Sequence, residues 1–488
     1  MNDEINESFI FSIEETEKYL QKPFLTKLYN YYKQNGFFNL ISNQIVNILI
    51  SIFLVIYSLF IANCVDWKEV SNLNEETHID DVIDMSELFS LNFFMWLIFI
   101  MYVIIIACKF VSLCNDFTNY NEVMYLLKLL NIKDKQLYRI SWEDIISRLS
   151  SYVSEVDVYT INSKICLRDN YFISIIDKDL FNLGFLCELM EWNITYCFIH
   201  SLFSDSLKLK REFIMQNDKF IKNIKYKTKC VAIGNFIFMP FIITYLLFYN
   251  LLIYGEHFYN KPQLLGARGW SRYAKWKFRN YNELQHEFHE KITSSQKLAE
   301  QYASQFPSRI LAMLSKLCIF ILSSFFVTMI GLSIINQQTL VLLFVTKTKS
   351  IIWFVGIFAS IIAVLKTSII EKSKFHPEEK MLELRDKINS IPEEWIKEDK
   401  EKTFFKYFPL EIILLAKEIL YTLIVPFKLY KFSFESDKII DQLQKMTITT
   451  PKYGNVNKYA IFDSDYIKDR KTLESLEQFK INNPNWYS

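Results

Sequence analysis

The sequence predicts an all-α membrane protein with four transmembrane helices, two re-entrant helical segments in the cytosolic leaflet, and cytosolic helical elaboration. Three observations predict this class. Hydrophobic residues fill 51% of the 488 positions, while Gly (9) and Pro (10) are scarce. Several apolar runs reach the length of about 18 residues that crosses a bilayer as a helix. Basic residues also gather in particular loops, as expected when Lys and Arg stay on the cytosolic side.

The expected organisation follows the apolar runs and the charges between them. We expect spanning helices at residues 45–62, 91–108, 310–335 and 351–370. The loop at 65–88 has eight acidic residues and only Lys68 as a base, so we place it in the lumen. The acidic start of the chain lacks the basic and apolar regions of a cleavable signal peptide, so we expect the first span to act as an internal signal.

Around these spans we expect eight segments. They are an N-terminal cytosolic lead-in (1–39), a first transmembrane pair (40–114), a cytosolic helical insert (115–229), a re-entrant hairpin (230–255), a cytosolic basic–aromatic helical loop (256–309), a second transmembrane pair (310–370), cytosolic helices with a second re-entrant segment (371–430) and a C-terminal tail (431–488). The insert includes helical patterns at 142–149 and 169–180.

Polar residues lie on one face of the first span, at Asn43, Asn47 and Ser51. Such a face usually contacts protein or a wet cavity rather than lipid tails. Simple hydrogen bonding between neighbouring helices explains it equally well.

Hydropathy and charge disagree for residues 230–252. The run is long enough to span, yet the following segment, 256–309, contains nine Lys and Arg against five Glu and should therefore be cytosolic. Pro240 lies in the middle of the run, where proline disturbs a helix. We therefore expect a hairpin that enters and returns on the cytosolic side. Residues 408–427, interrupted by charges and by Pro426, fit a second re-entrant or interfacial segment.

Two basic stretches flank the first re-entrant segment. The run from Lys208 to Lys229 precedes it and would favour anionic lipid, although a solvated helix face explains the run equally well. Residues 264–290 follow it, and on a helix they would form an aromatic stripe (Trp270, Tyr273, Ala274, Lys277, Tyr281, Leu284, Phe288) opposite a charged one (Arg268, Arg272, Lys275, Arg279, Glu283, His286, Glu290). Such an aromatic stripe packs in protein or at a bilayer interface.

Catalytic and cofactor-binding patterns are missing from the sequence. We find no nucleotide-binding or nucleophile-elbow motif, and His286 and His289 are three residues apart rather than four, so we expect no enzyme activity, no cofactor and no metal site. The net charge of +1 does not indicate a nucleic-acid partner. The eight cysteines include no C-x-x-C pair, and we expect them to be reduced. Any transport should therefore be passive.

A head-group path across the membrane is the function that these features favour. Moving a lipid head through hydrocarbon is expensive unless cations and hydroxyls line a wet groove. The candidate residues are Lys261, Arg268, Arg272, Lys275, Arg279 and Glu283, with the polar face of the first span and the breaks at Pro240 and Pro426. A surface pair between Arg279 and Glu283, one turn apart, is the structural alternative for those two residues.

The stretch LGARGWSRYAKWKFRNYNELQHEF resembles the autophagy-related protein nine family of autophagosomal phospholipid scramblases. Four other segments resemble the family in the same order: RDNYFISIIDKDL, YNLLIYGEHFYNKP, FHPEEKMLELRDKINSIPEEW and LEIILLAKEILYTLIVPF. The resemblance covers roughly residues 20 to 465. Family members commonly have long partner-recruiting tails, whereas the tails here are short.

The resemblance implies a passive, ATP-independent scramblase that re-equilibrates phospholipids between leaflets during autophagosome expansion. It also implies a homotrimer with cytosolic termini, which shuttles on vesicles from the Golgi and endosomes to the autophagosome precursor and to contact sites with the endoplasmic reticulum. A lipid-transfer protein and autophagy initiation factors are the implied partners. Two alternatives stay open: a channel or transporter, and a membrane scaffold that recruits autophagy partners without transport as its main role.

Overall fold

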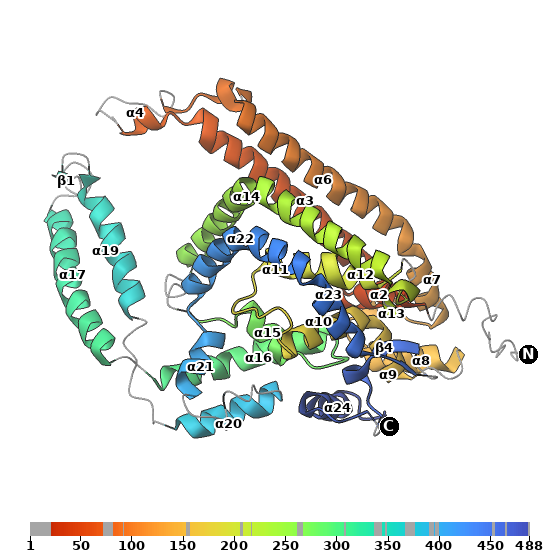
Figure 1. Ribbon diagram of the computed structural model, residues 1–488. Coiled ribbons are helices and arrows are strands. Elements are labelled where there is room, and N and C mark those ends of the chain that lie inside the picture. Colours follow the sequence, from red (N-terminus) through yellow and green to blue (C-terminus); the bar gives the residue numbers. More distant parts are fainter. Residues whose placement is uncertain are drawn as a thin grey trace, which may run out of the picture. The chain divides into compact units, whose positions relative to one another are not determined.

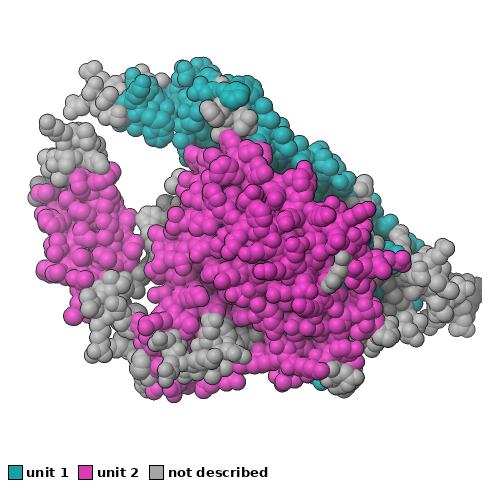
Figure 2. Space-filling model, viewed as in Figure 1, with its two compact units in different colours: residues 1–167, 203–210, 480–488 teal, residues 168–202, 211–479 magenta. Residues whose placement is uncertain are grey.

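The protein is mostly helical and divides into two compact units, which Figure 2 distinguishes by colour. The structure is a computed structural model, and it describes residues 21–71, 82–90, 92–152, 157–204, 208–215, 217–260, 267–306, 309–335, 344–346, 349–366, 376–389, 395, 400–450, 454–463 and 466–486. Unit 1 comprises residues 1–167, 203–210 and 480–488. Unit 2 comprises residues 168–202 and 211–479.

Two long apolar helices dominate unit 1. The helix α3 (Phe37–Leu59) continues into a π-helical turn, η1 (Phe60–Cys64), and packs along α6 (Phe93–Asn119) (Figure 1). Large apolar side chains such as Leu49 and Phe53 point outward and are 58% exposed. Extended apolar surface of this kind requires lipid or another protein as its neighbour. Between the two helices the chain forms α4 (Trp67–Ser71) and η2 (Met85–Phe89).

Short helices form the rest of unit 1. They are α2 (Lys22–Lys33), α7 (Asn121–Leu129), η3 (Asp134–Gln136), α8 (Trp142–Tyr152) and α9 (Val158–Ile165). The Trp142 ring packs against Tyr29 and Tyr32, at centroid distances of 5.2 and 5.3 Å, which joins α8 to α2. The helical pattern predicted at 142–149 is confirmed by α8.

Two proline-containing helices pack along one another in unit 2. These are α14 (Asp218–Asn260), with Pro240 inside it, and α22 (Glu411–Phe434), with Pro426 inside it. Figure 1 shows each of them changing direction along its length. Residues 230–255, which we predicted to be a re-entrant hairpin, thus lie within one bent helix, and the side to which this segment returns stays a prediction. An interior proline removes one backbone hydrogen bond and kinks a helix without necessarily ending it.

Four helices are long and apolar enough to cross a membrane, judged by length and composition within the described residues. Their ranges are Phe37–Cys64, Phe99–Leu129, Asp218–Asn250 and Met313–Leu332. Three of them overlap predicted spans, but Asp218–Asn250 covers the segment that we expected to be re-entrant. The fourth predicted span corresponds to α19 (Ile351–Lys366), which is shorter, at 16 residues.

A helical hairpin pairs α17 (Arg309–Ile335) with α19, and Phe325 contacts Phe358 at 6.4 Å between ring centroids. Two short antiparallel strands, β1 (Phe344–Thr346) and β2 (Lys349–Ser350), lie between these helices in the chain. They lie between the third and fourth predicted spans.

The remaining elements of unit 2 come from the insert, the loop after α14 and the tail. They are α10 (Leu167–Asp177), α11 (Glu188–Ile194), η4 (Thr195–Ile199), α12 (His200–Leu202), α13 (Arg211–Ile214), α15 (Arg272–Phe278), α16 (Gln285–Ser304), α20 (Pro377–Ile388), α21 (Lys400–Tyr407), α23 (Ser436–Lys445), β3 (Thr447–Thr450), β4 (Gly454–Asn457), η7 (Lys458–Ala460) and α24 (Arg470–Asn482). The predicted tail is thus folded, with an antiparallel β3–β4 hairpin and a terminal helix.

An aromatic core forms around α15, α16, α20 and α21. Trp270 lies 4.6 Å from Phe408 and 4.9 Å from Phe278 between ring centroids, and Trp395 packs against Phe278 and Phe404. Trp270 and Phe278 are almost fully buried. Several aromatic residues of the 264–290 stretch therefore pack inside the protein, one of the two environments that the sequence allowed.

Candidate functional site

The predicted helix over 264–290 is interrupted, and this is the main correction to the sequence-based site. The structure has a two-turn helix, α15, then a turn at residues 279–284, then α16. Asn282 has a φ of 58°, a left-handed conformation that asparagine adopts more readily than most residues. The Glu283 carboxylate accepts a hydrogen bond from the Asn280 backbone N–H at 2.8 Å. These local bonds compete with helical ones, so the helix ends although the amphipathic pattern continues.

The start of α15 is tied to the start of α22. Gly269 N–H donates to the Pro409 carbonyl at 3.0 Å, Ser271 N–H to Tyr407, and Glu411 N–H to Ala267. The Ser271 hydroxyl then caps α15 by accepting from Ala274 N–H at 3.2 Å. This extended pairing fixes the basic loop to the end of one of the two bent helices.

Arg268 belongs to this junction. Its guanidinium lies over the Phe405 ring at 4.4 Å and donates to the Phe408 carbonyl at 3.3 Å. The Arg268 carbonyl accepts from the Gln296 side chain at 2.7 Å, which joins the segment to α16. Burial lowers the pKa of Arg268, which nevertheless remains charged at neutral pH.

Arg272 and Lys275 are both accessible to solvent. Arg272 is 37% exposed and forms ion pairs with Glu188 at 2.9 Å and Glu191 at 3.3 Å, both on α11. Lys275 is exposed, and in the described part of the chain it has no carboxylate within ion-pair distance. Burial of Glu191 raises the pKa of its carboxyl above the usual value, although the nearby Arg272 partly offsets this effect.

Arg279 and Glu283 are buried rather than at the surface, and each forms an ion pair with another residue. Arg279 binds Asp169 of α10 at 2.6 Å, with the arginine side chain 5% exposed. Glu283 binds Lys291 of α16 at 2.6 Å, and Lys291 also donates to the Phe278 carbonyl at 2.9 Å. Each charge is satisfied inside the fold, the condition under which buried ions are tolerated.

The turn itself is held by uncharged polar contacts. The Asn282 side chain donates to the Ala460 carbonyl at 2.7 Å and accepts from the Asn170 amide at 2.8 Å. The Asn282 N–H donates to the Asn170 side chain at 2.9 Å. Tyr281 N–H donates to Ser475 of α24 at 3.1 Å. Three elements distant in the sequence thus converge on one turn.

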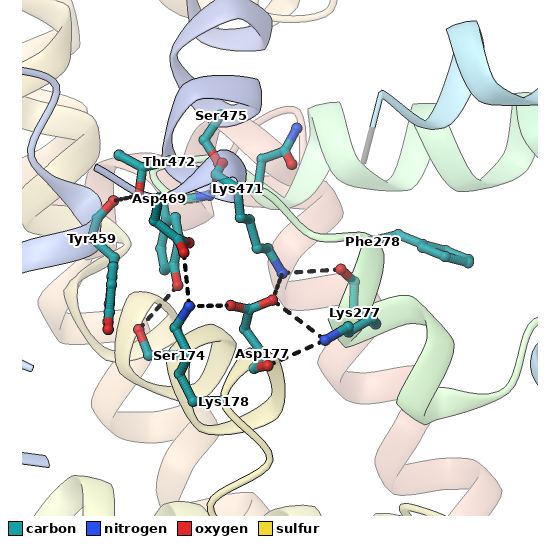
Figure 3. Close-up of polar contacts among 12 residues, drawn as sticks. Ser174, Asp177, Lys178, Lys277, Phe278, Tyr459, Asp469, Lys471, Thr472 and Ser475 are labelled. Atoms are coloured by element: carbon teal, nitrogen blue, oxygen red, sulfur yellow. Dashed lines mark hydrogen bonds and ion pairs between the residues drawn. The ribbon is translucent and has the colours of Figure 1, made fainter. Parts of the chain in front are cut away.

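An ion-pair network lies beside the turn (Figure 3). The Asp177 carboxylate contacts Lys178 at 3.0 Å, Lys277 at 3.4 Å and Lys471 at 3.8 Å, and Lys178 also contacts Asp469 at 3.0 Å. Burial lowers the pKa of Lys471 to about 8, although the nearby Asp177 favours its charged form. The three lysines outweigh the effect of burial on Asp177 and hold its pKa below the usual value.

The predicted polar face of the first span forms contacts within unit 1. Lys109 of α6 donates to the Ser51 hydroxyl at 2.6 Å, and Ser51 donates to the Asn47 carbonyl at 2.8 Å. Asn43 lies 3.5 Å from the Gln34 side chain. The alternative of helix–helix hydrogen bonding thus describes Ser51.

The remaining predictions concern Lys261, the cysteines and metal binding. Lys261 lies outside the described residues. None of the eight cysteines forms a disulfide. Among the described residues, no group of three His, Cys, Asp or Glu side chains is placed to hold a metal ion.

Comparison with known proteins identifies the family. The family model described as autophagy protein ATG9 matches residues 21–463. The chain belongs to the ATG9 family. The match spans α2 through η7 and therefore includes α14, α15 and α22. Autophagy-related protein 9 of Saccharomyces cerevisiae is 30% identical over 93% of this chain and 49% of the relative. The Kluyveromyces lactis protein of the same name is 27% identical over 91% of this chain and 52% of its own length.

A solved structure supports the fold of this ATG9-family chain. The cryo-EM structure of Schizosaccharomyces pombe Atg9 matches with a TM-score of 0.69 and 24% identity, covering 91% of this chain and 98% of that one. The chain spans about half the length of the curated relatives it matches. The resemblance inferred from the quoted segments is thereby confirmed.

Several residues of the site escaped the sequence-based prediction. Asp169 and Asp177 lie about one hundred residues before their partners, and Lys471 nearly two hundred residues after. Their only local signal is that charged residues interrupt otherwise apolar helical patterns. The asparagines at 280 and 282 were the readable clue to the turn, since asparagine favours turns over helix interiors.

Proposed function

We propose that this ATG9-family chain is a passive phospholipid scramblase, which re-equilibrates lipids between leaflets without ATP while an autophagosome membrane expands. One observation carries the proposal. Two apolar helices, α14 and α22, each bend with an interior proline and pack along one another, and the extended pairing at 267–271 connects their assembly to the basic loop. Bent apolar helices beside a cationic loop supply the polar access that a lipid head group requires.

The path residues divide by their environment. We propose that Lys261, Arg268, Arg272 and Lys275 flank the head-group path. We propose separately that Asn43, Asn47 and Ser51 form a polar membrane face of unit 1. Arg279 and Glu283 support the path from within, because their ion pairs with Asp169 and Lys291 fix the turn that ends α15. Lys275 is the strongest candidate for direct contact, being exposed and without an ion pair in the described residues.

Membership of the ATG9 family supports a proposal for the cellular setting. We propose that the chain has cytosolic termini, assembles as a homotrimer, and resides on vesicles from the Golgi and endosomes, on the autophagosome precursor and at contact sites with the endoplasmic reticulum. A lipid-transfer protein would deliver phospholipid to its cytosolic leaflet, and initiation factors would recruit it. Scrambling relieves the imbalance that one-sided delivery creates.

A liposome assay tests the activity. The purified full chain is reconstituted with head-labelled phospholipid, and a membrane-impermeant quencher reports how much label is reachable from outside. We expect nearly all label to become reachable without ATP, and Arg272→Gln with Lys275→Gln to slow the exchange several-fold. The matched control is Lys468→Gln with Lys480→Gln, two exposed lysines far along the chain. If wild-type protein leaves the inner-leaflet label protected, the scramblase proposal is wrong.

A scaffold role is the second candidate, and the ion pairs favour it. Arg272, Lys277 and Arg279 are each occupied by carboxylates of the same unit, so much of the basic loop serves the fold itself. A variant that cannot scramble but still supports autophagosome growth in cells would establish the scaffold as the main role.

A further inference from the structure

The basic residues of unit 2 fall into two groups, and the difference between them locates a site outside the predicted path. Around α15, most basic side chains form ion pairs with carboxylates of unit 2. Arg272, Arg279 and Lys291 are examples. Near the start of α14, Lys225 and Lys229 have no carboxylate within ion-pair distance among the described residues. A phosphate ligand needs cations that the protein has not already neutralised.

Lys225 and Lys229 share one aromatic neighbour. Their ammonium groups lie 5.9 and 4.7 Å from the centroid of the Phe434 ring, at the end of α22. Phe434 is 52% exposed and packs edge-on against Tyr430, which is 45% exposed. The two lysines lie four residues apart and hence on one face of α14. A half-buried pair of cations over an exposed ring is thus assembled from two helices.

Neighbouring charges leave this pair available. The carboxylate closest in sequence to Phe434 is Glu435, and it lies 3.7 Å from Lys431. Lys227, between the two lysines, is used by the fold: it donates to the Tyr196 carbonyl at 2.8 Å and to Ser201 at 3.0 Å. Lys225 and Lys229, by contrast, form no such hydrogen bond or ion pair with the described residues.

Apolar surface continues from the lysines along the same two helices. Phe236 of α14 contacts Phe427 of α22 at 5.9 Å between ring centroids, and these rings are 52% and 61% exposed. Because Lys229 meets Phe434 while Phe236 meets Phe427, the two helices run antiparallel here. Seven residues of helix separate Lys229 from Phe236, roughly 10 Å along the axis. The cations would face the charged head group of a phospholipid, and the exposed rings at this distance would face the upper part of its acyl chain.

We propose that Lys225, Lys229 and Phe434 form a binding site for the head group of an acidic phospholipid, whose acyl chain lies along Phe236 and Phe427. The phosphate and the additional negative charge of the head group would bind the two ammonium groups, with the ring limiting their hydration. The site rests on the proposed function only in requiring that this seam lie at a membrane surface. It places the acidic-lipid contact on the bent pair of helices rather than on α15.

Lipid retention by the full chain tests the site without using transport as the readout. The protein is purified in mild detergent with an equal mixture of phosphatidylcholine and phosphatidylserine, and native mass spectrometry measures the bound lipids. We expect wild type to retain phosphatidylserine preferentially, and Lys225→Gln with Lys229→Gln to reduce that retention about 25-fold, since each cation near a surface adds roughly fivefold to binding. Phe434→Leu should reduce it by a smaller factor.

The matched control removes the same charge from the same helix. Lys219 and Lys222 are exposed and precede the site, so Lys219→Gln with Lys222→Gln should leave retention within about twofold of wild type. An equal loss in both double variants would show a diffuse basic field and overturn the site. Unchanged retention in the Lys225 and Lys229 variant would overturn it as well.

Two further arms separate the alternatives. Inorganic phosphate or soluble glycerophosphoserine should fail to displace the retained lipid, and displacement by either at equal concentration would make this a free-anion site instead. If a variant melts early, photoreactive phosphatidylserine on wild type replaces it: crosslinks should map to α14 near Lys225 to Phe236, and crosslinks elsewhere alone would refute the proposal. Selective retention by a protein that does not scramble would refute the proposed transport while leaving this site intact.

Discussion

The Asp169 carboxylate lies 2.6 Å from the Arg279 guanidinium, whose side chain is only 5% exposed. The sequence places Arg279 on the charged face of a helix, but the fold turns it inward to a partner 110 residues earlier. Arg279 also donates to the Glu283 carbonyl at 3.3 Å. This arginine therefore holds the basic loop on α10. Replacing it should lower the stability of the protein more than it slows lipid exchange.

Arg279→Gln should destabilise the protein by about 3 kcal/mol, because it leaves a partly buried carboxylate without its counter-charge. Arg272→Gln should change stability by less than about 1 kcal/mol, since its ion pair with the 72% exposed Glu188 is screened by solvent. Thermal unfolding in detergent measures both. Equal melting temperatures for the two variants would contradict the assignment of different roles.

The turn after α15 depends on asparagine at position 282, where φ is 58°. Asn282→Ala should cost about 2 kcal/mol or more, through lost hydrogen bonds and a left-handed conformation that alanine resists. Asn282→Gly loses the same side-chain bonds but accepts the backbone conformation, so it should be less harmful by roughly 1 kcal/mol. Melting curves of the two variants give the comparison, and a glycine variant less stable than the alanine variant would count against it.

Lys471 should make stability depend on alkaline pH. Its pKa is about 8 in the folded protein and 10.5 in the unfolded reference. The unfolded chain therefore binds more protons between these values, and stability rises as the pH increases through this window. Below pH 8 the full penalty of burying the ammonium group is present. The rise amounts to at most about 3 kcal/mol.

The matched variant for this pH dependence is Lys471→Met, which keeps the length of the side chain. The difference in melting temperature between wild type and Lys471→Met should shift in favour of wild type between pH 8 and pH 10. The exposed Lys468→Met serves as the control and should show no such shift. A difference that stays constant over this range would refute the assigned role of Lys471.

Pro240 should maintain the bend in α14. Pro240→Ala restores the missing backbone donor, so the helix should straighten and the distance between spin labels at positions 222 and 249 should increase. Pro23 lies in the first turn of α2, where proline removes no helical bond, so Pro23→Ala should leave the distance unchanged. An unaltered distance in Pro240→Ala would mean that packing against α22 alone sets the bend.

The sequence predicted well those features that depend on neighbouring residues. The apolar runs of α3, α6 and α17, the charged helix α20 and the disturbance at Pro240 were all readable, because length, periodicity and proline chemistry act locally. Quoted segments also identified the family. The sequence did not show that one helix continues through Pro240, since proline alone does not determine whether a helix kinks or ends.

Long-range partners could not be predicted in the same way. Nothing near Arg279 or Lys277 in the sequence indicates Asp169 or Asp177, and a 431–488 tail of mixed composition gives no sign that Lys471 and Ser475 reach the centre of unit 2. The amphipathic pattern at 264–290 predicted one continuous helix, but the turn that contains Asn280 and Asn282 ends α15 in the middle of this pattern. Buried polar networks depend on tertiary placement, which periodicity does not encode.

The central claim is that α14 enters the membrane and returns to the same side, although Asp218–Asn250 is long and apolar enough to cross. Single cysteines at Lys222 and Lys275, in a chain whose native cysteines are replaced by serine, test it in sealed vesicles with a membrane-impermeant maleimide. A cysteine at Ser86, in the acidic loop expected on the opposite side, is the reference. We predict that positions 222 and 275 label together from the cytosolic side while position 86 stays protected. Labelling of 222 and 275 from opposite sides would show that α14 spans the bilayer, and the account would be wrong.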